Sequence, residues 1–122
     1  MKIINWFQIM AADLDRAVKF YGDVFKVSFH RAEMMGEKHA FFALDTMETL
    51  RTGGEIIQSP RHQPSAEGVL IYFNAPDGVD AVLARAAQAG GKVLLPKTSI
   101  GENGLIGIIL DSEGNRLGVH CM

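Results

Sequence analysis

The chain has 122 residues, of which 48% are hydrophobic, and a formal net charge of −2 at pH 7. This length predicts one domain, and so small a charge provides no field that would hold nucleic acid or an anionic membrane. No apolar stretch approaches the roughly 20 residues of a membrane helix, and the N-terminus lacks the regions of a signal peptide. The single cysteine excludes an internal disulfide framework. Together these features predict a cytoplasmic globular protein without a nucleic-acid or membrane partner.

The first half of the chain reads as a strand, a helix and three more strands. Asp13 stands where a helix N-cap belongs, and apolar residues then recur at helical spacing as far as Phe25. The preceding run is largely apolar, as in a strand buried on both faces. The expected elements are a strand at 3–10, a helix at 14–25, strands at 27–33 and 39–44 around a turn at 35–38, a loop at 45–52 and a strand at 55–58.

Residues 59–68 contain Pro60 and Pro64 and read as a linker, because such a segment cannot pair in the middle of a sheet. Beyond it the pattern begins again, and Gly90 and Gly91 end an alanine-rich helix. The expected elements are a strand at 69–74, a turn at 77–78, a helix at 79–89, a strand at 92–95 that Pro96 ends, a loop at 97–103 and a hairpin of strands 105–110 and 116–120.

The two halves therefore have the same order of elements. An offset of 65 residues superposes Leu14 on Val79 and Glu55 on His120. A unit that cannot cover its own sheet needs its copy beside it, which predicts an α+β domain of two tandem βαβββ modules. We expect one domain over 1–122, with module one at 1–58, the linker at 59–68 and module two at 69–122. A ferredoxin-like domain would need a helix between the second and third strands, and residues 34–44 offer none.

Two motifs carry a family resemblance that covers nearly the whole chain. The stretch ADLDRAVKFYGDVF at 12–25 resembles the opening of the glyoxalase, bleomycin-resistance and dioxygenase group, the vicinal oxygen chelate superfamily. The stretch DSEGNRLGVH at 111–120 is similar to the closing hairpin of that group. The resemblance implies paired βαβββ modules whose strands form a U-shaped mixed sheet around a cavity, and in many members a homodimer. This fold hosts lyases, isomerases, dioxygenases and antibiotic-binding proteins, so the function must be argued from the site.

Alternation along the strands predicts which side chains line this cavity. If Phe7 and Ile9 face the helix, the residues that alternate with them along the strand face the cavity. The same rule is applied to the other strands. The predicted ligand-binding residues are Trp6, Gln8, Glu55, Ile71, Phe73 and His120. An apolar and aromatic wall with a few polar groups is the composition expected of a small-molecule pocket.

The resemblance also implies four metal-ligand positions, which fall on Trp6, Glu55, Val69 and Gly118. Tryptophan, valine and glycine side chains supply no ligand there, so we expect no metal cofactor. The alternative is a divalent metal held by displaced ligands, namely Gln8, Glu55 and His120, since imidazole and carboxylate can form an open site. We expect His30, His39 and His62 to be surface or rim residues, because their spacing is not that of metal ligands.

Three hypotheses for the function follow. The first is a small-molecule-binding protein of this superfamily with degenerate metal-ligand positions. The second is an enzyme: a lyase or dioxygenase with the displaced metal ligands, or a metal-free isomerase that uses Glu55 or His120. We expect Glu55 to be exposed and solvated, whereas burial would raise its pKa and suit it to act as a base. The third is a domain that pairs with another protein. We expect a homodimer or a tightly paired two-module domain, because each half leaves apolar sheet and strand edges that need covering.

Overall fold

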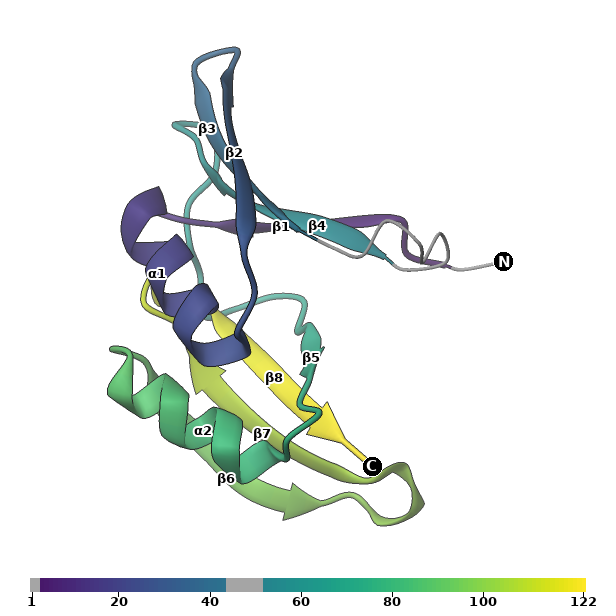
Figure 1. The fold of residues 1–122 in the computed structure, drawn as a ribbon. Helices are drawn as coiled ribbons and strands as arrows, with labels where there is room; N and C mark the ends of the chain where they lie inside the picture. The colour runs from purple at the N-terminus through teal and green to yellow at the C-terminus, as the bar shows by residue number, and fades with distance from the viewer. Residues whose placement is uncertain (1–2, 44–51) are drawn as a thin grey trace.

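The computed structural model describes residues 3–43 and 52–122, which form two mixed sheets and two helices (Figure 1). The strand order of the first sheet is β1-β4-β3-β2, with β1 parallel to β4 and the other neighbours antiparallel. Its elements are β1 Trp6–Met10, α1 Leu14–Phe25, β2 Phe29–Met34, β3 Glu37–Phe42 and β4 Gly53–Gln58. The predicted loop at 45–52 and the end of the strand predicted at 39–44 reach into 44–51, outside the described residues.

The second sheet repeats this arrangement, with the order β5-β8-β7-β6 and β5 parallel to β8. Its elements are β5 Tyr72–Asn74, α2 Val79–Gln88, β6 Lys92–Ser99, the 3₁₀ turn η1 Gly101–Asn103, β7 Leu105–Leu110 and β8 Arg116–Cys121. The predicted α+β fold of two tandem βαβββ modules is therefore confirmed. Among the described residues no strand ladder joins the two sheets, and both helices lie on the same side of the molecule (Figure 1).

Helix α1 forms as the sequence predicts. The Asp13 side chain accepts a hydrogen bond from the Arg16 backbone N–H at 3.1 Å, and Lys26 ends the helix in the left-handed conformation with φ of 56°. The buried face consists of Leu14, Ala17, Phe20, Tyr21 and Val24. Each large apolar side chain buried in this way stabilises the fold by about 1.5–3 kcal/mol. Within the described ranges no helix is long and apolar enough to cross a membrane.

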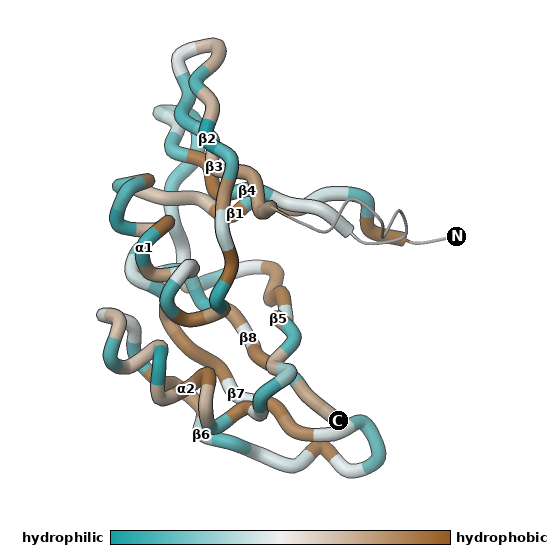
Figure 2. The backbone as a smooth tube through the Cα atoms, viewed as in Figure 1, coloured by the Kyte–Doolittle hydropathy of each residue, from teal (hydrophilic) through white to brown (hydrophobic). Residues whose placement is uncertain are grey.

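A shared core joins the two modules. The hydrophobic segments follow the strands that lie beneath the helices, as Figure 2 shows for β7 and β8. Phe7 of β1 and Phe73 of β5 meet edge to face, with ring centroids 6.0 Å apart. The buried Tyr21 hydroxyl donates to Asp111 of the other module at 2.5 Å, and burial, then the Asp111 charge, raises the pKa of Tyr21. The two modules thus share one core and a buried hydrogen bond between Tyr21 and Asp111.

Glu113, in the turn between β7 and β8, caps the first helix from the second module. Its carboxylate accepts from the backbone N–H groups of Ala12 and Asp13 at 2.9 and 2.8 Å and from Arg16 Nε at 2.7 Å. Burial raises the pKa of Glu113, but the Arg16 hydrogen bond and the helix-end amides outweigh burial and lower it. An ionised carboxylate at a helix N-terminus is favoured by the helix dipole.

Three predicted elements differ from the structure. Strand β1 is covered on one face only, since Trp6 and Gln8 are exposed while Ile9 is buried. Strand β5 is shorter than the predicted 69–74, and Val69 is 90% exposed outside it. Strand β6 continues through Pro96 to Ser99, because it is an edge strand whose ladder to β7 shifts register around the proline.

Candidate functional site

Trp6, Gln8 and Glu55 meet on the face of the first sheet that points away from α1, which we call the open face. The register of β1 and β4 places Gln8 directly beside Glu55. The Trp6 indole N–H donates to Glu55 Oε2 at 3.0 Å, and the Gln8 amide donates to the same oxygen at 3.2 Å. Glu55 is 5% exposed and Trp6 is 48% exposed. Three of the six predicted ligand-binding residues thus form one hydrogen-bonded group with a solvent-facing aromatic ring.

His39 completes this group, although the sequence placed it at the surface or rim. It is buried on β3, and its Nδ1 hydrogen-bonds Glu55 Oε1. Its ring stacks on Phe41 with an interplanar angle of 5°. The prediction failed because it tested spacing along the chain, whereas the β3–β4 ladder, which pairs Phe41 with Glu55, decides which residues meet. Once that hairpin register is known, alternation places His39 and Phe41 on the open face.

Glu55 is a buried carboxylate that is nevertheless ionised at neutral pH. Burial raises the pKa of Glu55, but the hydrogen bonds from His39, Gln8 and Trp6 outweigh burial and hold the pKa below its ordinary value of 4.5. The expectation of an exposed, solvated side chain was therefore wrong, and burial does not make this carboxyl a strong base. Instead Glu55 is a fixed negative charge under the open face.

The ionised state of Glu55 fixes which atom donates in this pair. A carboxylate only accepts hydrogen bonds, so His39 Nδ1 carries a proton and donates it to Glu55 Oε1. Nε2 is buried and has no hydrogen-bond partner among the described residues. The distance from His39 Nε2 to Glu37 Oε1 is 3.9 Å. His39 therefore lies between the carboxylates of Glu55 and Glu37.

Glu37 connects the open face to the start of the linker. Its Oε2 accepts from the Ser59 hydroxyl at 2.5 Å and from the two Arg61 nitrogens Nε and Nη2 at 3.1 and 2.5 Å. The Ser59 hydrogen bond, then that of Arg61, lowers the pKa of Glu37. All three bonds use Oε2, so Oε1 remains available on the side of His39.

A cavity of about 200 Å³ adjoins the open face at Gln8 and runs between the modules beneath the linker. Ile71 and Phe73, two further predicted ligand-binding residues, also line it. On the side of the second module its wall includes Arg116, whose Nε is buried and has no hydrogen-bond partner in residues 3–43 and 52–122. Gln8 therefore connects the Glu55 group to a partly open cavity with apolar and polar walls.

The predicted facing of Phe73 was wrong, although its edge reaches this cavity. Phe73 pairs with Val119 and packs in the core, with its ring centroid 4.5 Å from that of Phe25. The residues of β5 that share a face with His120 are Tyr72 and Asn74.

A one-residue difference between the modules explains this error. Tyr72 is the counterpart of Trp6, 66 residues later, whereas their partners Gly118 and Gly53 are 65 residues apart. The connection from the first strand to the helix is thus one residue shorter in the second module. A slip of one residue moves every side chain of a strand to the other face.

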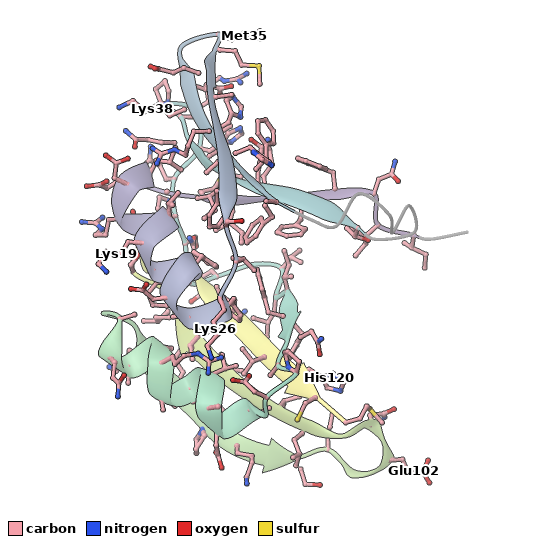
Figure 3. All side chains as sticks on the ribbon, viewed as in Figure 1. Lys19, Lys26, Met35, Lys38, Glu102 and His120 are labelled. Atoms are coloured by element: carbon pink, nitrogen blue, oxygen red, sulfur yellow. The ribbon has the colours of Figure 1, made fainter. Side chains whose placement is uncertain are left out.

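His120 does not join Glu55 within one chain. It lies on β8 in the second sheet, away from β1 and β4 (Figure 3), and a nitrogen of its ring is 2.6 Å from the Asn103 carbonyl oxygen. The predicted triad of Gln8, Glu55 and His120 is therefore split between two sheets.

The residues at the implied metal positions do not fit a metal ion. Trp6 turns its N–H toward Glu55, Val69 is exposed outside the strand, and the Tyr72 ring covers Gly118. Over residues 3–43 and 52–122, no group of three His, Cys, Asp or Glu side chains could hold a metal ion. The oxygens of Glu55 are occupied by three N–H donors, so this site offers hydrogen bonding and charge rather than coordination.

Several solved structures share the fold of this protein over nearly the whole chain. The fosfomycin resistance protein FosX from Listeria monocytogenes has a TM-score of 0.74 at 14% identity, over 98% of this chain and 91% of that chain. Hypothetical protein SA1046 from S. aureus has a TM-score of 0.72 at 18% identity, over 100% and 99%. A V278E mutant of glyoxalase I from Zea mays has a TM-score of 0.75 at 17% identity, over 96% and 43%. At these identities the likeness concerns the fold.

Two curated proteins are similar to this chain in sequence. "Putative glyoxylase CFP32" from Mycobacterium bovis and its namesake from Mycobacterium tuberculosis are each 28% identical over 118 residues, covering 94% of this chain. The chain spans only 44% of the length of these relatives. A family model matches residues 3–119. With two βαβββ modules, this match and these neighbours, the chain belongs to the Glyoxalase/Bleomycin resistance protein/Dioxygenase superfamily.

Proposed function

We propose that the protein binds a small molecule on the open face of the first sheet, without a metal ion. The observation that supports this most directly is the Trp6–Gln8–Glu55 group, in which a solvent-facing ring and an amide are anchored on a buried carboxylate. Preorganised polar groups beside an aromatic surface are typical of ligand sites, and Gln8 extends the surface into the cavity of about 200 Å³.

A second copy of the chain would complete the site. The open face and the corresponding face of the second sheet, which carries Tyr72 and His120, each have an exposed aromatic residue, Trp6 at 48% and Tyr72 at 43%. Among the described residues the edge strands β1 and β5 are each paired on one side only. His120 reaches a ligand on Trp6 only if the partner lays its second sheet across the first. The longer curated relatives, of which this chain covers 44%, have room for two such units in one chain. Light scattering should give a homodimer at micromolar concentration, and a monomer would contradict this part of the proposal.

The binding proposal is tested with Trp6→Ala and His120→Ala once a screen has found a ligand. Loss of a buried aromatic contact typically costs about 1–3 kcal/mol, or roughly ten- to a hundredfold in affinity. Trp6→Ala should show this loss with an unchanged circular dichroism spectrum, and His120→Ala should show it in the dimer only. The exposed Glu102→Gln variant is the matched control. Unaltered affinity in both variants would place the ligand elsewhere.

A metal-free isomerase is the second candidate, and the Glu55–His39 pair favours it. A carboxylate that holds an imidazole is the arrangement of a general base and the group that orients it. The lowered pKa of Glu55 makes Glu55 itself a weak base, which leaves His39 as the candidate base. Incorporation of deuterium from D₂O into a bound carbonyl compound, lost in His39→Gln, would support this function, and binding without exchange would favour the first.

A further inference from the structure

We propose that the partly open cavity between the modules binds a small organic acid, with the carboxylate of the acid on Arg116. This inference goes beyond the proposed function, because its evidence involves neither the Trp6 ring nor the Glu55 charge, although Gln8 borders both sites. Three features of the described residues support it. These are a cationic side chain without a carboxylate partner, a linker that is held over the cavity, and an apolar side of the cavity wall.

The cationic side chain is that of Arg116, the first residue of β8, which lines the cavity. Within residues 3–43 and 52–122 it has no carboxylate within ion-pair distance, whereas every other arginine of these ranges has one. The pairs are Arg16–Glu113, Arg31–Asp15, Arg61–Glu37 and Arg85–Asp77. Arg116 therefore brings to the cavity a positive charge that the described residues leave without a counter-ion.

The guanidinium group of Arg116 also lacks hydrogen-bond acceptors. In the part of the chain that the structure describes, it makes one hydrogen bond, from Nη2 to the Gly68 carbonyl oxygen at 3.2 Å. The buried Nε has no partner there, and neither has Nη1, which unlike Nε is not closed off from solvent. A carboxylate matches the fork of N–H donors that a guanidinium group presents. We therefore place the carboxylate of the ligand on the Nη edge of Arg116, where Nη1 is accessible.

The linker forms one side of the cavity and is held there by the start of β8. It passes this strand on its way from the first sheet to β5 (Figure 1). The Ser65 backbone N–H donates to Asn115 Oδ1 at 2.9 Å, and the Gly68 carbonyl accepts from Arg116. Asn115 is itself fixed, since its Nδ2 donates to the Met10 carbonyl oxygen at 2.7 Å. The cavity thus has walls from both modules and the linker, so a ligand in it would contact all three.

The apolar side of the wall favours an acid with an apolar body over an inorganic anion. This side consists of Ile9, Met10, Val69, Ile71, Phe73 and Leu117. The cavity of about 200 Å³ has room for a compact molecule, because a cavity of about 150 Å³ holds benzene. Glu67, the one carboxylate among the described lining residues, is exposed, so water and salt screen its charge from the ligand.

The test compares benzoate, phenylacetate and 4-methylpentanoate with their uncharged amides in calorimetric titrations. At least one acid should bind at least about tenfold more tightly than its amide, because only the acid compensates Arg116. The inference is overturned if no acid binds at millimolar concentrations, or if each amide binds as well as its acid. Inorganic phosphate should compete poorly with the acid. Phosphate that competes equally would contradict the assignment of an apolar acid, because charge alone would then decide binding.

Arg116→Met removes the charge and keeps an apolar stem in the wall. It should weaken binding of the acid at least about tenfold and leave binding of the amide unchanged. Arg31→Met, which removes an exposed arginine outside the cavity, is the matched control and should keep the preference for the acid. A preference that survives in Arg116→Met would overturn the inference. Glu67→Gln should bind the acid at least as tightly as the parent, and weaker binding there would contradict a site that selects negative charge.

Nuclear magnetic resonance of the parent protein gives a readout that requires no variant to fold. Titration with the acid should shift the side-chain N–H signals of Arg116 and the backbone signals of Gln8 and Ile71. Shifts confined to these cavity residues would support the inference, whatever Trp6→Ala shows for the open face. A shift of the Trp6 indole N–H without any at Arg116 would place the acid on the open face, which would overturn this inference and support the proposed function.

Discussion

The open face of the first sheet and the corresponding face of the second sheet share a scaffold but carry different side chains. On the first sheet, Trp6 and Gln8 of the opening strand hydrogen-bond Glu55 of the closing strand. On the second sheet, the corresponding pairs are Tyr72 over Gly118 and Asn74 beside His120, whose ring contacts the Asn103 carbonyl. The first face thus holds a buried ionised carboxylate, while among the described residues the second has none at the equivalent place.

This difference shows that the ladder determines where side chains meet, and that residue identity determines what they do there. The parallel pairing of the first and last strands brings two side chains together in both modules. Only in the first module do they combine N–H donors with a carboxylate. At the corresponding positions of this duplicated fold, one module therefore carries a carboxylate with its N–H donors and the other carries no carboxylate.

Among the variants proposed here, Glu55→Ala should cause the largest loss of stability. It leaves the N–H groups of Trp6, Gln8 and His39 without an acceptor, so we expect a loss of about 2–4 kcal/mol in the free energy of unfolding. His120→Ala, the equivalent change on the second face, should cost less than about 1 kcal/mol. Urea denaturation measures both, and equal losses would mean that the two faces contribute alike to stability.

Substitutions of Tyr21 and Tyr72 compare the hydrogen bond between the modules with a hydroxyl on the second face. Tyr21→Phe removes the buried hydroxyl that donates to Asp111, and we expect a loss of about 1–2 kcal/mol. Tyr72→Phe removes a hydroxyl from a residue that is 43% exposed, so its effect should stay within about 0.5 kcal/mol. Thermal or urea unfolding of both variants tests this. A Tyr21→Phe protein as stable as the parent would mean that the Tyr21–Asp111 hydrogen bond does not stabilise the core.

The pH dependence of stability should differ between the faces. The folded pKa of Glu55 is lower than its ordinary value of 4.5, so its stabilising contribution is complete above that value and is lost as the pH falls through the folded pKa. Glu37 and Glu113 act in the same direction. Unfolding measured from about pH 6 to about pH 3 should be less steep for Glu55→Gln than for the parent. An unchanged slope in the variant would mean that Glu55 is not ionised in the fold.

Metal removal should have the smallest effect. We expect less than about a tenth of a zinc, nickel, iron or manganese ion per chain, because a catalytic zinc site generally needs three protein ligands. Dialysis against a chelator should leave the melting temperature unchanged, and added nickel or zinc should produce no lactoylglutathione lyase activity. Elemental analysis that finds about one ion per chain, lost in His120→Ala, would favour an enzyme with displaced ligands.

Much of the fold could be predicted, because its signals are local. The N-cap Asp13, the helical spacing up to Phe25 and the repeated order of elements define the two modules. Alternation along β1 also places Trp6 and Gln8 on the open face, and Ile9 in the core. The continuation of β6 through Pro96 could not be read in this way, because a proline is tolerated according to whether its strand lies at an edge.

The site was only half predictable, since it depends on register between strands. His39 meets Glu55 because β3 pairs with β4, which no spacing along the chain reveals. The facing of Phe73 depends on a connection one residue shorter than its counterpart. Both errors concern how two strands are aligned rather than which residues form them.

The cap that Glu113 places on α1 restricts how genes of this family can recombine. An exchange at the linker would combine this first module with the β7–β8 turn of another chain. Unless that turn brings an acidic residue to the same place, the backbone N–H groups of Ala12 and Asp13, just before α1, lose their acceptor and Arg16 loses its partner. The second module is therefore not a freely exchangeable part, because it adds to the local N-cap Asp13 a contact made about a hundred residues further along the chain.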